Sequence, residues 1–290
     1  MLDAVGPERL TVIANTADDA EVHGVHVSPD PDLVTYWLAD RIDERGYGIA
    51  GDTWRIMEAL EAAGRPAWFR LGDRDLAMCL VRTELLRAGE PLTAAHAEVV
   101  RAMGVRARVL PMSDDPVRTH VTSGGRSRPF QEFMIVDRAA GPIEAVELRG
   151  VEEARPSAEA LAAIEAADAI VLGPSNPVIS IGPILAVPGM REALLAAPAP
   201  VVAVSPFVGG RAVKGPTEPF MEHAGLPLGA AGVLAAYEGA IDGLVCDEDL
   251  EGAPVPLLVT DTLMGDAGAR GRVARETLDF AAGLTRGGRP

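Results

Sequence analysis

Two hydrophobic patterns alternate along this chain. Leu10–Ala14, Ala169–Leu172 and Val201–Val204 are short continuous apolar runs, which is the pattern of parallel strands buried on both faces. Thr53–Ala63 and Arg74–Ala88 instead carry apolar residues at helical spacing, so each predicts an amphipathic helix. Strands that alternate with helices in this way are typical of an α/β protein.

Further elements extend the alternation. They are helices over Pro91–Met103 and Ala158–Ala167 and strands over Arg106–Leu110, Val146–Gly150 and Val255–Leu258. From residue 156 onward the order helix, strand, loop repeats. We therefore expect a single α/β domain over residues 1–290, with a Rossmann-like, doubly wound, mainly parallel sheet.

One segment departs from this order. Thr119–Thr122 and Phe130–Val136 alternate apolar and polar residues on either side of Gly124-Gly125. Alternation around a glycine pair predicts antiparallel strands joined by a turn. We expect a small β or irregular insertion here.

Two of the predicted buried strands continue into loops rich in glycine and serine. The first loop reads GPSNP from Gly173, and the second reads SPFVGG from Ser205. In open α/β sheets ligands bind just beyond the carboxyl ends of the strands. Free backbone N–H groups in such loops can cradle a phosphate, although either loop alone could be an ordinary turn. The recurrence of the loop favours a binding site.

The charge of the chain restricts its partners. A net charge of −16 disfavours both nucleic acid and anionic membrane surfaces. It also disfavours a phosphate-bearing ligand, unless a metal ion or local cations neutralise the phosphate. The candidate cations are Arg70, Arg74, Arg82 and Lys214, and Lys214 is the one lysine of the sequence.

The apolar segments indicate the compartment. Cys79 and Cys246 each lie in an apolar run, so they are expected to be reduced core residues of a cytoplasmic protein rather than a disulfide or metal pair. No apolar run is long enough to span a bilayer, and no membrane association is expected.

Carboxylates recur at predicted strand ends and turns. They are Asp18, Asp19, Asp30, Asp32, Asp52, Asp73, Asp75, Asp114 and Asp115. A single pair of this kind is usually an Asx turn or a helix N-cap. The repetition favours a shared site for Mg²⁺, which binds carboxylate and phosphate oxygens. His23 and His26 make a poor metal motif and are expected in a polar turn.

Ordered motifs over nearly the whole chain resemble one family. They include NTADD from Asn15, SPDPD from Ser28, RLGDRDLA from Arg70, LPMSDDPVRT from Leu110, GPSNPVISIGP from Gly173 and SPFVGGRAVKGP from Ser205. Together they resemble the 2-phospho-L-lactate transferases, called phosphoenolpyruvate transferases in actinobacteria, which act in the biosynthesis of the deazaflavin coenzyme of F-420 type.

The resemblance implies a Mg²⁺-dependent phosphotransferase. The ribityl hydroxyl of 7,8-didemethyl-8-hydroxy-5-deazariboflavin attacks a phosphorus of a guanosine diphosphate ester of lactate or enolpyruvate, and GMP leaves. The sequence leaves open which three-carbon acid is transferred. We expect the protein to be a homodimer.

The resemblance also implies roles for particular residues. Asp18 and Asp19 would act as catalytic base or metal ligands. Asp32, expected in a turn with little part in the core, and Arg70 would contact the deazaflavin from one cleft wall. The guanosine diphosphate would contact four residues of the two loops: Ser175, Asn176, Ser205 and Gly209.

One departure from the family's pattern and one alternative function stand beside this resemblance. The family's first strand and GGTGGAK-like loop are missing ahead of Met1, so we expect weak nucleotide binding by the chain as given. The alternative function is a non-catalytic, nucleotide-sugar-binding regulator of the related gluconeogenesis-factor group. The intact SPDPD and RLGDRD segments argue against that alternative.

Overall fold

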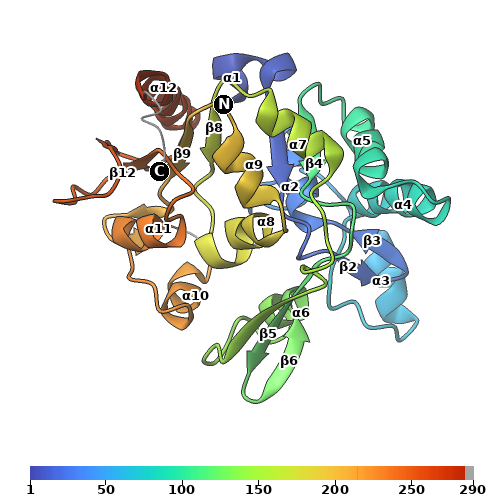
Figure 1. Ribbon diagram of the computed structural model, residues 1–290. Helices are drawn as coiled ribbons and strands as arrows, with labels where there is room; N and C mark the ends of the chain where they lie inside the picture. Colours follow the sequence, from blue (N-terminus) through green and yellow to red (C-terminus); the bar gives the residue numbers. More distant parts are fainter. Residues whose placement is uncertain (214, 285–290) are drawn as a thin grey trace.

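Parallel strands form two ladders in the computed structural model, which describes residues 1–213 and 215–284 (Figure 1). The first ladder pairs β1 (Thr11–Ala14) with β4 (Arg108–Pro111). The second has the order β13-β12-β9-β8 and consists of β8 (Ile170–Leu172), β9 (Val201–Val204), β12 (Gly243–Cys246) and β13 (Leu257–Val259). The expected Rossmann-like α/β class with parallel strands is confirmed.

Strands β9 and β12 are buried over their whole length, which explains their uninterrupted apolar sequences. Val201 and Ala203 face a cluster that includes helix α9 (Met190–Ala196). Val202 and Val204 face the opposite side, against helix α12 (Ala267–Gly283). Successive residues of one strand therefore pack on opposite helical layers, as a doubly wound sheet requires.

The amino-terminal half adds a helical layer around β4 and a short hairpin. Helix α5 (Leu92–Ala102) packs on β4 and on α4 (Asp73–Arg87), and α3 (Arg55–Ala62) contacts α4. The hairpin joins β2 (Ala20–Val22) to β3 (Val25–Val27). The three helices begin and end within two residues of the predicted bounds.

The insertion is a three-stranded antiparallel sheet of order β6-β5-β7, which extends from the lower edge of the molecule in Figure 1. Its strands are β5 (Arg118–Ser123), β6 (Arg126–Pro129) and β7 (Ala145–Arg149). The strand expected over Phe130–Val136 is wrong, because Phe130–Ile135 forms helix α6. Phe130 and Phe133 lie one helical turn apart and both pack on Phe220, so helical spacing prevails over the apparent alternation.

The remaining elements are mostly short helices and strands. They are α1 (Leu2–Val5), η1 (Pro7–Arg9), α2 (Pro29–Leu38), α7 (Ala158–Glu165), the π-helical turn η2 (Pro177–Ile181), α8 (Gly182–Ala186), β10 (Phe207–Val208), β11 (Arg211–Ala212), α10 (Thr217–His223) and α11 (Ala230–Ala236). Among the described helices none is long and apolar enough by itself to cross a membrane. One bent pair, Pro177–Ala186 with Met190–Ala196, meets that test by length and composition only.

Candidate functional site

The loop after β1 is folded by its own polar side chains. The Asn15 Oδ1 atom accepts a hydrogen bond of 2.9 Å from the backbone N–H of Ala17. The N–H of Thr119, on β5, donates to the Ala17 carbonyl oxygen at 2.7 Å. The first bond closes the loop on itself, and the second attaches the inserted sheet to it. As a result Asp18 and Asp19, both buried, lie at the carboxyl end of β1, where ligands bind in open α/β sheets.

Asp19 is held by two side chains from the following hairpin and helix. Its Oδ1 accepts from the Ser28 hydroxyl at 2.7 Å, and its Oδ2 lies 2.8 Å from Nε2 of His26. His26 is therefore part of the site, although the sequence placed it in a polar turn. It lies in β3, and its own N–H donates to the Thr83 hydroxyl at 2.7 Å.

Asp18 is a buried carboxylate without a compensating cation. Its Oδ1 has no hydrogen-bond partner within the described residues. Burial raises the pKa of Asp18 well above its ordinary value, and the neighbouring Asp30 carboxylate raises it further. In residues 1–213 and 215–284, no arginine, lysine or histidine forms an ion pair with Asp18.

Asp30, in the first turn of α2, is a third carboxylate of this site. Its Oδ2 accepts from the Asn15 side-chain amide at 3.1 Å. Burial raises the pKa of Asp30 to about 6, and the Asp19 charge adds to that effect. Asp30 is among the recurring carboxylates for which the sequence predicted a shared Mg²⁺ site, but no individual role was assigned to it. The signal that could have singled it out is its place in SPDPD, close to Asp32.

The three carboxylates fit a hard divalent cation. Like charges gathered in a buried place are stable only when they are protonated or when a cation joins them. Asp18 offers an oxygen with no partner, and Asp19 and Asp30 supply further oxygens, which is the ligand chemistry that Mg²⁺ prefers. Asp18, Asp19 and Asp30 are therefore the residues that would hold the ion, after a rearrangement of their side chains, because the described structure does not bring one oxygen from each within 4.8 Å of the others.

Two of these carboxylates, those of Asp18 and Asp19, adjoin a cavity of about 200 Å³. Asp18, Asp19 and Glu21 line it on one side, and Arg118 and His120 of β5 line it on another. Its remaining walls include the aromatic rings of Trp68 and Phe130 together with Thr119, Gln131 and Glu132. A phosphate group and a flat apolar group could both be accommodated by such a lining.

Asp32 lies in a second group of acidic residues with a different environment. It is buried in the first turn of α2, so the expectation of a turn residue with little part in the core is wrong. Arg82 donates to both Asp32 oxygens, at 2.6 and 2.8 Å, and Arg82 is fully buried. Since both oxygens are occupied, a contact between Asp32 and a deazaflavin stays a prediction.

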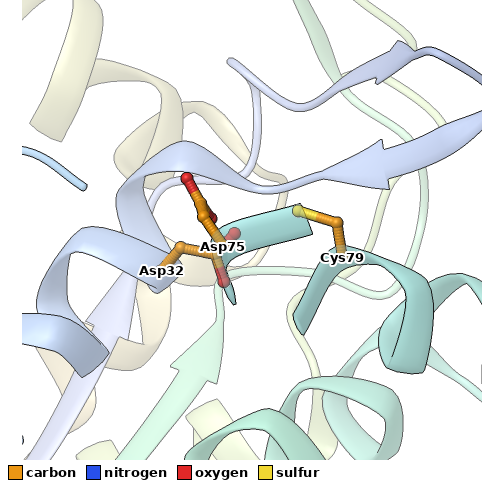
Figure 2. Close-up of side chains that lie close together, drawn as sticks. All are labelled: Asp32, Asp75 and Cys79. Carbon is orange, nitrogen blue, oxygen red and sulfur yellow. The ribbon is translucent and has the colours of Figure 1, made fainter. Parts of the chain in front are cut away.

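Asp75 and Cys79 of α4 lie beside Asp32, close enough for the three to be considered as metal ligands (Figure 2). Protein groups already occupy them, however. The Tyr36 hydroxyl donates to Asp75 at 2.7 Å, and Arg82 lies 3.6 Å from the Cys79 sulfur. Burial, followed by the Asp32 charge, raises the pKa of Asp75 to about 6. Because the guanidinium neutralises this group, it is a poor place for a metal ion.

Arg70 is exposed and forms an ion pair with Glu61, with 2.8 Å between Nη1 and Oε1. Its guanidinium also lies 5.4 Å from the ring centre of Trp54. Within the described part of the chain, no hydrogen bond or ion pair joins it to Asp32. That the two share a cleft wall stays a prediction, although Trp68, close to Arg70 in sequence, does line the cavity.

The loop after β8 meets the loop after β1. Asn176 accepts from the N–H groups of Val178 and Ile179, at 2.8 and 3.2 Å, and so caps η2. Its side-chain nitrogen is buried without a partner in the described residues. The Ile179 carbonyl accepts from Asn15 at 3.4 Å, which joins this loop to the carboxylate site, while Ser175 is exposed.

The loop after β9 is held by its own polar groups. The Ser205 hydroxyl oxygen accepts from the Phe207 N–H at 3.1 Å, and the Gly209 N–H donates to the Asp247 carboxylate at 2.5 Å. Helix α10 packs on both η2 and β11, so the two predicted nucleotide loops share one neighbouring helix. Their contact with guanosine diphosphate stays a prediction, and Lys214 lies outside the described residues.

Comparison with known proteins identifies the family. Residues 2–255 match the family model described as 2-phospho-L-lactate transferase CofD. A phosphoenolpyruvate transferase from Streptomyces griseus is 41% identical over 286 residues, which cover 94% of this chain and 90% of that protein. A 2-phospho-L-lactate transferase from Methanosarcina mazei is 41% identical over 242 residues, covering 83% and 79%.

A solved structure agrees on the fold. A member of the UPF0052 family from Bacillus halodurans superposes with a TM-score of 0.51 at 21% identity, over 91% of this chain and 81% of that one. At this identity the likeness shows the fold alone. The family model and the two transferases, which match most of the chain, show more: the chain belongs to the 2-phospho-L-lactate transferase family.

Proposed function

We propose that this chain transfers a phospho-lactyl or phospho-enolpyruvyl group from a guanosine diphosphate ester to the ribityl hydroxyl of 7,8-didemethyl-8-hydroxy-5-deazariboflavin, releasing GMP. One observation carries the proposal. In a chain of this transferase family, Asp18 and Asp19 line a cavity at the carboxyl end of a parallel strand, and Asp18 has no cation paired with it among the described residues. The names of the relatives support the substrate class.

The residues of the cavity suit phosphoryl transfer. The hydroxyl oxygen forms a bond to the phosphorus, the bond from that phosphorus to the GMP oxygen breaks, and the hydroxyl proton goes to a carboxylate. Asp18 is suited to take that proton because its Oδ1 has no hydrogen-bond partner among the described residues and burial raises its pKa. Asp19 is fixed by Ser28 and His26, so its oxygens keep one orientation.

The same carboxylates would hold Mg²⁺. When bound, the ion supplies positive charge that stabilises the diphosphate and the departing GMP. Trp68 and Phe130 exclude water from one side of the cavity and offer apolar surface to a flat ring.

The direct test is a transfer assay with the purified chain, the deazaflavin, Mg²⁺ and the guanosine diphosphate ester of lactate or enolpyruvate. Mass spectrometry should show the deazaflavin phosphodiester and one equivalent of GMP. Asp18→Asn should lower kcat/KM by about 10²- to 10⁴-fold, since proton transfer contributes that much to catalysis. The control Asp168→Asn changes an exposed carboxylate paired with Arg9 and should leave the rate unchanged.

Two results would contradict the proposal. One is full activity of Asp18→Asn, which would remove the cavity from the reaction. The other is tight binding of nucleotide sugars without any transfer, which would favour the regulatory alternative.

A further inference from the structure

Arg118 contributes a positive charge to the cavity that the protein does not use for itself. Its Nη1 atom donates to the carbonyl oxygens of Val117, at 2.6 Å, and Thr16, at 3.5 Å. No carboxylate in residues 1–213 and 215–284 lies within ion-pair distance of this guanidinium. A guanidinium has five N–H donors, so most of its donor capacity remains available to a ligand.

Two other arginines of the same small sheet are different. Arg149 pairs with Glu147 at 2.9 Å. Arg128 pairs with Glu132 at 3.3 Å and with Asp137 at 2.7 Å. Glu132, which lines the cavity, is therefore neutralised by Arg128. The charge of Arg118 is left for something that enters the cavity.

The backbone fixes Arg118 relative to the carboxylates. It is the first residue of β5, and the next residue, Thr119, donates its N–H to Ala17, which precedes Asp18. The two main-chain acceptors hold one end of the Arg118 guanidinium, so little side-chain freedom is lost on binding a ligand. The cavity thus combines a fixed guanidinium with Asp18 and Asp19 on another wall.

We propose that Arg118 binds the phosphoryl group that is transferred, through its non-bridging oxygens. This rests on the proposed function and adds a specificity-determining residue to it. A planar guanidinium matches two phosphate oxygens, and it supplies the local cation that a protein of net charge −16 needs at such a place. Arg118 therefore distinguishes guanosine diphosphate compounds, which carry this phosphoryl group, from GMP, which lacks it.

The test compares GDP with GMP by isothermal titration calorimetry in the presence of Mg²⁺, using the full chain. The wild-type protein should bind GDP more tightly than GMP. Arg118→Gln should weaken GDP binding about 10- to 100-fold, the loss expected for hydrogen bonds to a charged group, and should change GMP binding by less than about twofold. Arg118→Lys should fall between the two, because it keeps the charge but loses the paired donors.

Arg149→Gln is the matched control. Arg149 is the cross-strand partner of Arg118 on β7, and the substitution removes the same charge from outside the cavity lining. It should leave both nucleotide affinities unchanged.

The outcomes separate the two proposals. If the wild-type protein prefers GDP and Arg118→Gln keeps that preference, the role of Arg118 is overturned and the transferase proposal stands. If Arg118→Gln loses GDP and GMP affinity equally, Arg118 supports the fold and the inference is equally wrong. If the wild-type protein neither prefers GDP nor catalyses transfer, the proposed function itself fails.

Discussion

Asp30 and Asp32 lie two positions apart in one motif, yet their surroundings are opposite. Asp32 meets the guanidinium of Arg82, which occupies both of its oxygens in the interior. Asp30 faces Asp18 and Asp19, and no described cation pairs with it. One turn of helix α2 thus supplies one carboxylate that is neutralised within the protein and one that is not.

This difference distinguishes a carboxylate that stabilises the fold from one that is available to a ligand. Burying a carboxylate costs free energy unless a cation pairs with it. Removing one partner of a buried pair destabilises the protein, because the other charge stays buried without compensation. Asp32 and Arg82 meet this requirement within the fold. Asp18 and Asp30 have no paired cation among the described residues, and Asp19 has only His26, so we infer that a ligand completes this cluster.

The largest expected effect is on the neutralised pair. Arg82→Met should lower the free energy of unfolding by about 3–5 kcal/mol, because Asp32 would keep a buried charge without a partner. Urea denaturation measures this. Arg87→Met, on the same helix but exposed, should cost less than about 1 kcal/mol. Equal effects of the two substitutions would mean that the buried pair has no special role.

The second prediction concerns pH and Asp30, which has no paired cation among the described residues. The pKa of Asp30 is about 6 in the fold and about 4 in an unfolded chain, so the folded state binds more protons between these values. The stability that protonation of Asp30 gives is present below pH 4 and is lost as the pH rises through 6.

Asp30→Asn should therefore raise the free energy of unfolding by about 3 kcal/mol at pH 7.5 without divalent cations, and by almost nothing near pH 4. Asp32→Asn should instead destabilise the protein at both pH values, because it removes the partner of Arg82. Urea denaturation curves of both variants at pH 4 and pH 7.5 measure these changes in the free energy of unfolding. A destabilised Asp30→Asn at pH 7.5 would show that Asp30 is paired after all.

The smallest expected change in the free energy of unfolding concerns the hydrogen bond by which Ser28 holds Asp19 in place. Ser28→Ala removes one hydrogen bond to Asp19 and should cost about 1 kcal/mol in the free energy of unfolding. It should also weaken Mg²⁺ binding, because Asp19 loses one fixed orientation. Ser123→Ala removes a hydrogen bond at an exposed position and serves as the control. Unchanged Mg²⁺ affinity in Ser28→Ala would separate Asp19 from the metal site.

The sequence predicted those parts of the fold that depend on local pattern. Strand β9 was predicted residue for residue, because it is buried on both faces and thus continuously apolar. Helix α6 was missed because its apolar residues suit either alternation or helical spacing, and contact with Phe220 decides between them. Such a contact, between residues far apart in sequence, leaves no local signal.

The sequence predicted which residues make up the site, but it did not predict which side chains pair with one another. Asp18 and Asp19 stood out as adjacent acids after a strand, but the partner of each depends on tertiary contacts. Arg82 was proposed as a partner for an anionic ligand, whereas its anion is Asp32, fifty positions away in sequence. His26 supports Asp19 only because a hairpin turns its strand toward the loop.

The cluster of Asp18, Asp19 and Asp30 is expected to bind a divalent cation, and this can be measured directly. The measurement is the melting temperature at pH 7.5 as Mg²⁺ is added, for the wild-type chain, Asp18→Asn and the control Asp168→Asn. A ligand that binds the folded state alone stabilises it by about 2.7 kcal/mol at 100 times its Kd, so the wild-type and control proteins should melt at progressively higher temperatures. Asp18→Asn should melt higher than the wild-type chain without Mg²⁺ and should gain little when it is added. An equal gain in Asp18→Asn, or none in the wild-type chain, would contradict the account.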